Sequence, residues 1–480
     1  MSTTTRATDL LPGALLLPRA SQAMFSQVLR RTVRFFFLFL AARKLGPEIF
    51  GTYVLLLAVT ETLSLMTGEG LADYVAREAA KVPDLARSLV HRVSAVRCLL
   101  ALALAPLAVM VLRLLHYPGE VQQAAAVLFL ALLARGPLAA VQGRFRAANR
   151  MDLLVWLEAV QGAVLLAFGT YLLSGAATLQ VVIAAEVGST AAAAVTAIWL
   201  ASRMSPDSPS PRVTWGAVWR ATATFNVYPL ITNIYDRVDI VILSVIAGNA
   251  AAGLYALPYR VLATLQIIPF GLTAAVLPVL TARAESPDDR QMCLRLATVL
   301  GVLSMFPALV LALLAKPLVH FILQASYAPS ADILRLLVWA AIPMFVNYGL
   351  NTFLLARSRE RLFVWTSTVC AVANVTLNLI LIPRYSYYAA AAVTIVTEVL
   401  LLVQNVVVIR RKFAFLPLPS RLWFPVAVLA LIVAAAEGIG SRISPFVVAA
   451  AACGVFTVVL HFSGSLKEIA ESMNLGATRA

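Results

Sequence analysis

The chain has 480 residues, of which 61% are hydrophobic and only 13% are charged, whereas soluble domains average about 45–50% apolar and ~25% charged residues. This composition excludes an ordinary soluble protein, and four scattered cysteines without a Cys-x-x-Cys pair support neither a disulfide framework nor a zinc site. The net charge of +15 could indicate nucleic-acid binding, so the positions of the basic residues decide its meaning.

Apolar segments separated by charged residues and Gly/Pro turns predict fourteen membrane-spanning helices, since one span needs about 20 apolar residues. Six helices precede a polar, proline-rich stretch at 202–218, six follow it, and two end the chain. In chain order we expect them over 24–42, 49–68, 93–112, 121–142, 153–174, 178–201, 220–247, 252–282, 292–315, 332–355, 362–382, 387–409, 422–437 and 444–463.

We therefore expect an all-α polytopic membrane protein built from two six-helix bundles and two C-terminal helices. The predicted parts are an N-terminal bundle over 1–201, a cytoplasmic linker over 202–218, a second bundle over 219–412, and helices 13 and 14 with a cytoplasmic tail over 413–480. No small-residue cleavage site follows an apolar run near the N-terminus, so we expect the first helix to be retained.

Basic residues are concentrated in alternate loops. The even-numbered loops hold 20 Lys and Arg residues, against seven in the odd-numbered loops and their helix ends. Because Lys and Arg favour cytoplasmic loops, both termini are predicted to be cytoplasmic. The positive charge is then mostly an orientation signal, and nucleic-acid binding loses its support.

Two segments of the first half recur in the second half. Residues 45–53 match residues 247–255 at an offset of 202, with Gly, Gly and Tyr in register. Residues 147–156 match residues 356–365 at an offset of 209. Ordered matches at similar offsets indicate a duplication, and six helices per copy give both copies the same orientation. Parallel six-helix repeats are an architecture of transporters.

Charged residues within predicted spans usually face a protein interior or a wet cavity. Arg30, Arg31 and Arg34 share one face of the first helix, and Glu61 lies on the second. Arg31 and Glu61 are each fifteen residues from the turn at Gly46, so we expect them at the same depth. Three arginines against one nearby glutamate leave a positive surplus, which a diphosphate ligand would explain because a planar guanidinium holds two oxygens.

The predicted seventh and eighth helices repeat this geometry with other residues. Asn233, Asp236 and Asp239 lie on the seventh helix, and Tyr259 and Arg260 on the eighth. Asp239 and Arg260 lie ten or eleven residues from the second turn, which predicts a similar depth for both. An open alternative is that the charges of both hairpins are ion pairs that only hold helices together.

Other polar residues within the spans are weaker candidates. Three glutamates could each accept a coupling proton, and two asparagine pairs at i,i+4 spacing are predicted to hydrogen-bond between helices. The glutamates are Glu158, Glu186 and Glu398, and the pairs are Asn347 with Asn351 and Asn374 with Asn378.

Nucleotide-binding and hydrolase motifs are absent from the sequence. It contains no GxxxxGK[ST] loop, no HExxH and no GxSxG. We therefore expect a secondary-type transporter without a cofactor or metal, and not an enzyme.

Short motifs of the chain resemble those of bacterial polysaccharide-biosynthesis flippases, which belong to the multidrug/oligosaccharidyl-lipid/polysaccharide (MOP) exporter superfamily. The segments Asp-Arg-Val-Asp at 236–239, Gly-Leu-Tyr at 253–255, Tyr-Arg-Val at 259–261 and Leu-Pro at 277–278 are similar to their seventh and eighth helices. The Leu-Gly-Pro-Glu-x-Phe-Gly turn at 45–51 resembles their first hairpin.

The resemblance implies two bundles around a central cleft and alternating access. It implies transport of undecaprenyl-diphosphate-linked oligosaccharide across the bacterial inner membrane for O-antigen, capsule or exopolysaccharide synthesis, with a polysaccharide polymerase or export proteins as partners. The related lipid II flippases have an arginine near the start of helix 8, which makes Arg260 a candidate diphosphate ligand by resemblance. The alternatives are a lipid II flippase for peptidoglycan and a membrane glycan polymerase or ligase.

The candidate residues fall into two groups. The substrate-binding residues are Arg30, Arg31, Arg34, Asn233, Tyr259 and Arg260, and the ion-coupling or charge-balancing residues are Glu61, Asp236 and Asp239.

Overall fold

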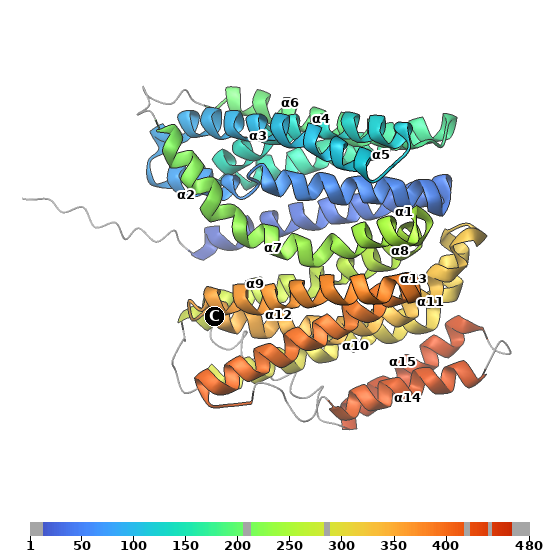
Figure 1. Ribbon diagram of the computed structural model, residues 1–480. Helices are drawn as coiled ribbons and strands as arrows, with labels where there is room; N and C mark the ends of the chain where they lie inside the picture. Colours follow the sequence, from blue (N-terminus) through green and yellow to red (C-terminus); the bar gives the residue numbers. More distant parts are fainter. Residues whose placement is uncertain (1–12, 205–212, 283–288, 417–422, 440–443, 463–480) are drawn as a thin grey trace, which may run out of the picture. The chain divides into compact units, whose positions relative to one another are not determined.

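A computed structural model describes residues 13–204, 213–282, 289–416, 423–439 and 444–462, and within these ranges the protein is helical (Figure 1). The helices are α1 (Gly13–Met66), α2 (Leu71–Lys81), η1 (Pro83–Leu85), α3 (Ala86–Leu114), α4 (Gly119–Ala147), α5 (Met151–Gly175), α6 (Leu179–Ser202), α7 (Trp215–Ala247), α8 (Asn249–Leu265), α9 (Ile267–Ala282), α10 (Asp289–Ile322), η2 (Ala325–Tyr327), α11 (Ala328–Leu337), η3 (Val338–Ala340), α12 (Ala341–Leu355), α13 (Glu360–Phe413), α14 (Trp423–Ile439) and α15 (Pro445–Phe462).

Two helices are each long enough to cross a membrane twice. The helices α1 and α13 have 54 residues each, which would make about 80 Å of straight helix against a hydrocarbon core of about 30 Å. Each has one residue with non-helical angles, Gly46 in α1 and Ser386 in α13. Each therefore consists of two arms joined at that residue.

The described chain contains nine helical segments long and apolar enough to cross a membrane, including the two long ones. Each of the fourteen helices predicted from the sequence overlaps a helix, a helix arm or a pair of consecutive helices. The prediction of an all-α polytopic membrane protein is confirmed.

The structure departs from the predicted helices in three places. A short amphipathic helix, α2, follows the second span after a turn at 67–70. The predicted helix 252–282 is broken at Gln266 into α8 and α9, and the 3-10 turn η3 interrupts the predicted helix 332–355. Part of the predicted linker, 205–212, lies outside the described residues.

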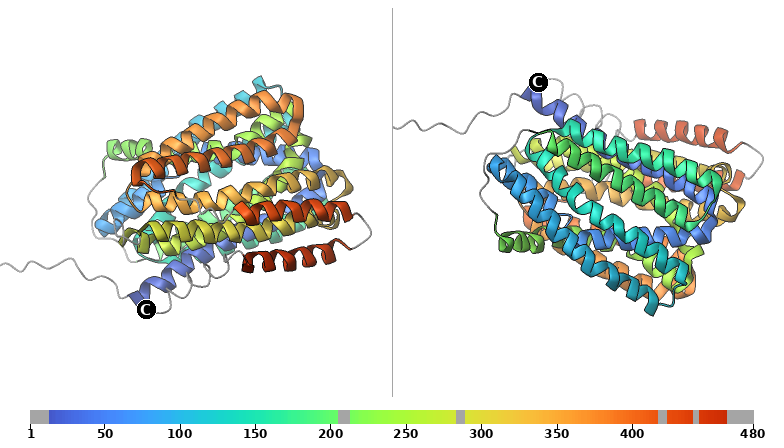
Figure 2. Two further views of the ribbon diagram at one scale, coloured as in Figure 1. Left: turned by 90° about the horizontal axis from the view of Figure 1, so that it is seen from below. Right: turned by 90° about the horizontal axis from the view of Figure 1, so that it is seen from above.

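By its contacts the chain divides into two units. Unit 1 contains residues 1–37 and 60–229, and unit 2 contains residues 38–59 and 230–480. In unit 1, buried side chains of α2 and α3 form a core with Ala140 of α4 and the first turns of α7. In unit 2, α14 and α15 pack on α10 (Figure 2). These two contact units differ from the two predicted six-helix bundles, 1–201 and 219–412. The boundaries of the bundles stay a prediction.

The first repeat match has a counterpart in the backbone. Gly46 and its equivalent Gly248 both have positive φ, 76° and 88°, a conformation that glycine adopts without steric cost. Within unit 2 the following helices cross at Gly51 and its equivalent Gly253. A Cβ on Gly51 would lie 1.7 Å from the carbonyl oxygen of Asn249, and one on Gly253 would lie 2.1 Å from that of Pro47. The contact is reciprocal because Pro47 and Asn249 are also equivalent.

The second repeat match also has the same local structure in both copies. Asn149 and its equivalent Ser358 are non-glycine residues with positive φ, 58° and 52°. The next amide in each copy bonds back in the same way: Arg150 N donates to Phe145 O at 2.9 Å, and Arg359 N donates to Leu354 O at 3.2 Å. Corresponding turns therefore precede α5 and α13, which supports the duplication inferred from the sequence.

Candidate functional site

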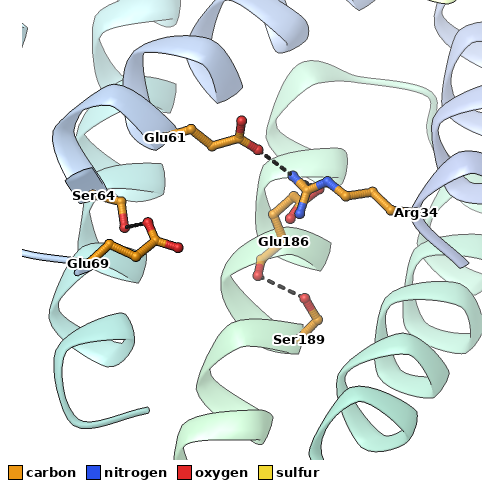
Figure 3. Close-up of polar contacts among 6 residues, drawn as sticks. All are labelled: Arg34, Glu61, Ser64, Glu69, Glu186 and Ser189. Carbon is orange, nitrogen blue, oxygen red and sulfur yellow. Dashed lines mark hydrogen bonds and ion pairs between the residues drawn. The ribbon is translucent and has the colours of Figure 1, made fainter. Parts of the chain in front are cut away.

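An arginine between two glutamates is the central polar feature of unit 1 (Figure 3). Arg34 lies on the first arm of α1, and its Nη2 is 3.3 Å from Oε1 of Glu186 on α6 and 3.7 Å from Oε1 of Glu61 on the second arm. The Glu186 side chain is only 3% exposed, against 21% for Arg34. Both distances exceed the ~2.7–2.9 Å of a strong charge-assisted hydrogen bond. The two carboxylates therefore lie close enough to Arg34 to compensate its charge.

A second ion pair lies on the same helix. Arg30 Nη1 is 3.5 Å from Oε1 of Glu158 on α5, and Arg30 also donates a hydrogen bond to Gln27. The Glu158 side chain is 10% exposed and that of Arg30 is 49% exposed. The carboxylate is thus held inside the unit while the arginine reaches its surface.

These contacts correct two expectations. Glu61 pairs with Arg34, which is one helical turn nearer the hairpin bend than Arg31, the residue predicted at its depth. The expected positive surplus was also wrong, since Glu158 and Glu186 approach the arginines from α5 and α6. Carboxylates of the same unit therefore face both Arg30 and Arg34.

Glycines on α5 explain why Glu158 faces the arginines. A Cβ on Gly162 would lie 3.0 Å from Val33 Cγ1, and one on Gly169 would lie 2.4 Å from a ring carbon of Phe37. The two glycines let α5 pack closely on the first arm of α1. Glu158 lies one turn before Gly162, on the same face, and is therefore carried toward the arginine face of α1.

A buried arginine holds the turn between α1 and α2. Arg97 of α3 is 1% exposed and donates from Nη1 to the carbonyl oxygen of Gly68 at 2.9 Å. In the same turn the Gly70 amide donates to Asn226 Oδ1 at 3.0 Å, and Ser64 Oγ donates to Glu69 Oε2 at 3.0 Å. Arg97 was not among the predicted site residues, although an ionisable residue inside the predicted span 93–112 is a signal that the sequence contains.

Unit 2 contains a separate buried carboxylate. Asp239 of α7 is 2% exposed, and it accepts hydrogen bonds from Tyr255 Oη at 2.5 Å and from the Ile240 amide at 2.7 Å. Tyr255 Oη also lies 3.0 Å from Thr394 Oγ1 of α13. Tyr255 of α8 thus bonds to α7 through Asp239 and to α13 through Thr394.

Asp239 lines a small pocket that contains a second carboxylate, Glu398. Asn347 Nδ2 of α12 donates to Oε2 of Glu398 on α13 at 3.0 Å, and Asn405 bonds to Asn347 and Asn351. The lining is carboxylate, hydroxyl and amide groups with one methionine and two aliphatic residues: Asp239, Tyr259, Leu262, Ala263, Gln266, Met344, Asn374, Thr394, Thr397 and Glu398.

The predicted asparagine pairs differ in role. The interhelical bonding expected for Asn347 and Asn351 is confirmed, because both bond to residues of α13. Asn378 instead donates to Asn374 within α13 at 2.9 Å, and Asn374 lines the pocket.

The remaining predicted residues are placed less completely. Tyr259 lines the pocket of unit 2, and Arg260, the next residue of α8, is half-buried. The side chains of Asn233 and Asp236 lie outside the described residues, although the α7 backbone is helical there. In the part of the chain that the structure describes, no three His, Cys, Asp or Glu side chains gather as a metal site would require.

A profile of the polysaccharide biosynthesis protein family matches residues 19–284, which is more than half of the chain. The chain belongs to the polysaccharide biosynthesis protein family. The family resemblance inferred from the sequence motifs is confirmed. No curated protein sequence matches the chain significantly.

Solved transporter structures share the fold of this polysaccharide biosynthesis protein. An inward-facing multidrug resistance MATE transporter of the MOP superfamily has 11% identity and a TM-score of 0.70, covering 80% of this chain and 94% of that chain. The lipid II flippase MurJ in an inward closed conformation has 13% identity and a TM-score of 0.69, covering 92% and 98%. A MOP transporter from Pyrococcus furiosus, described as having a binding pocket of reverse polarity, has 12% identity and a TM-score of 0.58, covering 81% and 93%. These likenesses establish a MOP-type fold.

Proposed function

We propose that the protein is a flippase that moves undecaprenyl-diphosphate-linked oligosaccharide from the inner to the outer leaflet of the bacterial inner membrane. The two bundles would expose the substrate site alternately to the two sides, and no bond would be made or broken. Family membership and the MOP-type fold support a transporter in polysaccharide synthesis. The observation that carries the proposal is Arg34, a guanidinium held within a membrane-spanning unit.

A diphosphate headgroup suits these arginines chemically. A guanidinium stays charged when partly desolvated and its planar fork can hold two phosphate oxygens at once. Arg34 and Arg30 lie 3.3–3.7 Å from carboxylates of the protein, so a phosphate would take the place of anionic oxygens that these arginines already face. The proposed substrate ligands are Arg30, Arg31, Arg34, Asn233, Tyr259 and Arg260.

The pocket of unit 2 suggests how transport is driven. Carboxylate, hydroxyl and amide oxygens are the ligands that hard cations such as Na⁺ or Mg²⁺ prefer, and Asp239 is buried among such groups. We assign Asp239, together with Asp236 and Glu61, to ion coupling or charge balance. A membrane potential would add about 2.3 kcal/mol per charge per 100 mV. The coupled ion is a proton or another cation, and transport should stop when an uncoupler, or an ionophore for that cation, collapses its gradient.

The proposed orientation, with both termini cytoplasmic, rests on the excess of Lys and Arg in the even-numbered loops, 20 against seven. Exposed tryptophans mark the membrane surface beside these loops. Tryptophan is enriched where helices meet the membrane surface, and exposed tryptophans lie at helix ends that adjoin the arginine-rich loops. Arg203 stacks over Trp199 at 5.2 Å and Arg92 over Trp215 at 4.8 Å. The exposed residues in question are Trp156, Trp199, Trp215 and Trp365.

The direct test measures lipid-linked oligosaccharide in each leaflet after depletion of the protein. Complete oligosaccharide confined to the inner leaflet is the expected result. Rescue by wild type and by Arg87→Ala, a change of an exposed arginine in the first turn of α3, should succeed, whereas Arg34→Ala and Arg260→Ala should fail at equal membrane levels. Lysine at either position should rescue poorly because a point charge does not replace a planar fork. Normal outer-leaflet delivery with failed chain extension would refute the proposal and indicate a polymerase or ligase.

A lipid II flippase is the second candidate. The lipid II flippase structure covers 92% of this chain, against 80% for the multidrug transporter. Depletion separates the two flippase functions. Arrest of peptidoglycan synthesis would indicate lipid II, and loss of surface polysaccharide with continued growth would indicate the proposed substrate.

A further inference from the structure

Two arginines of α1 are paired with carboxylates of the protein itself. Arg34 is shared between Glu186 at 3.3 Å and Glu61 at 3.7 Å, and Arg30 lies 3.5 Å from Glu158. The three glutamates come from three different helix segments, the second arm of α1, α5 and α6. Any anion that binds these arginines must therefore compete with carboxylates that belong to the protein.

Only a strongly charged anion is expected to displace Glu186 and Glu61 from Arg34. Nη2 of Arg34 lies 3.3 Å from Glu186 and 3.7 Å from Glu61, so a ligand that binds this nitrogen must displace two carboxylates. A diphosphate has several oxygens and more than one negative charge. Its attraction to Arg34 can therefore exceed its repulsion by the two glutamates. A phospholipid phosphodiester carries one charge spread over two free oxygens, and it gains less for the same displacement.

We propose that Glu186 and Glu61 form an internal counter-ion that the substrate headgroup displaces from Arg34, and that this displacement selects a diphosphate over the single phosphates of ordinary membrane lipids. The inference rests on the proposed flippase function. A bilayer presents phospholipid at far higher concentration than any lipid-linked oligosaccharide, so an uncompensated arginine would be occupied by phospholipid. The glutamates lower the affinity for every anion, and only the more highly charged one still binds.

The same pairs favour release of the substrate. After the headgroup leaves, the carboxylates neutralise Arg34 again, so the empty protein does not carry a bare charge within the membrane. Replacing a glutamate by glutamine should therefore strengthen binding and slow release at the same time.

The test compares two probes on purified full-length protein in detergent. Undecaprenyl diphosphate and phosphatidylglycerol are titrated against wild type, Glu186→Gln, Glu61→Gln, Arg34→Ala and the control Glu69→Gln. Glu69 is a carboxylate that follows the same hairpin but bonds to Ser64, away from Arg34 (Figure 3). Size-exclusion profiles and unfolding midpoints show which variants are folded. Because Glu61 is more exposed than Glu186, at 19% against 3%, Glu61→Gln carries the test if Glu186→Gln does not fold.

We expect Glu186→Gln and Glu61→Gln each to bind phosphatidylglycerol at least about fivefold more tightly than wild type, which corresponds to about 1 kcal/mol. The ratio of the affinities for undecaprenyl diphosphate and phosphatidylglycerol should fall in these two variants. Glu69→Gln should bind both probes as wild type does. Unchanged or weaker binding of both probes by the two variants, with binding still lost in Arg34→Ala, would overturn the counter-ion inference alone. Wild-type protein that binds neither probe, or binding that Arg34→Ala leaves intact, would instead refute the role of Arg34 in the proposed function.

Discussion

The crossing of the two equivalent glycines gives the sharpest stability prediction. A methyl group on Gly51 would lie 1.7 Å from the carbonyl oxygen of Asn249 and 2.9 Å from the amide nitrogen of Gly253. These are backbone atoms, so no side-chain rotation relieves the overlap, and the helices would have to separate by about 2 Å to restore ordinary contact. Overpacking of this kind costs about 1–3 kcal/mol and the separation loses further contacts. We expect Gly51→Ala to lower the free energy of unfolding by about 2–4 kcal/mol.

The assay is thermal unfolding of the purified protein in detergent, followed by tryptophan fluorescence. Gly454→Ala is the matched control, since it lies within α15 and a Cβ there would meet nothing within 4 Å. Alanine in an open helical position should stabilise by about 0.5–1 kcal/mol. Gly253→Ala should be as damaging as Gly51→Ala. If Gly51→Ala unfolds at or above the wild-type midpoint while Gly454→Ala behaves as expected, the proposed close crossing is wrong.

Two further changes test other parts of the fold by the same assay. Arg97→Ala removes a side chain that is 1% exposed and bonds to Gly68 O, so it should cost about 2–4 kcal/mol; a loss no larger than that of the exposed Arg87→Ala would contradict this packing role. Ser358→Gly should stabilise by about 1 kcal/mol because its positive φ is unfavourable for a side chain. Asn149→Gly should stabilise the protein less than Ser358→Gly does, since asparagine tolerates positive φ better. A larger stabilisation by Asn149→Gly would refute the reasoning.

The number and order of the helices could be predicted from the sequence because each depends on a local property. A run of about 20 apolar residues reports on one helix alone, and the bends at Gly46 and Gly248 depend on two residues that readily take positive φ. The helix α2 was not predicted because it is short and amphipathic. Its apolar face is buried by α3, α4 and α7.

The ion-pair partners of the site residues could not be predicted by counting residues from the turn, because they depend on how the helices pack. Counting from Gly46 placed Glu61 beside Arg31, but the ion pair is with Arg34, one turn away. Glu158 and Glu186 were noted individually, yet their approach to the arginines follows from the packing of α5 and α6 on α1. The glycines at 162 and 169 were the available signal, since they mark the face of α5 that lies closest to α1.

The joining of two repeats in one chain lets equivalent positions hold different residues. In a symmetric dimer of identical subunits, residue i on one subunit meets residue j on the other and each change appears twice. Here Phe37 and Asp239 are equivalent at the offset of 202, and both are buried. The ring of Phe37 packs against Gly169, and the carboxylate of Asp239 accepts a hydrogen bond from Tyr255. A single mutation can therefore alter the polar site of one half without placing a second carboxylate in the apolar interior of the other.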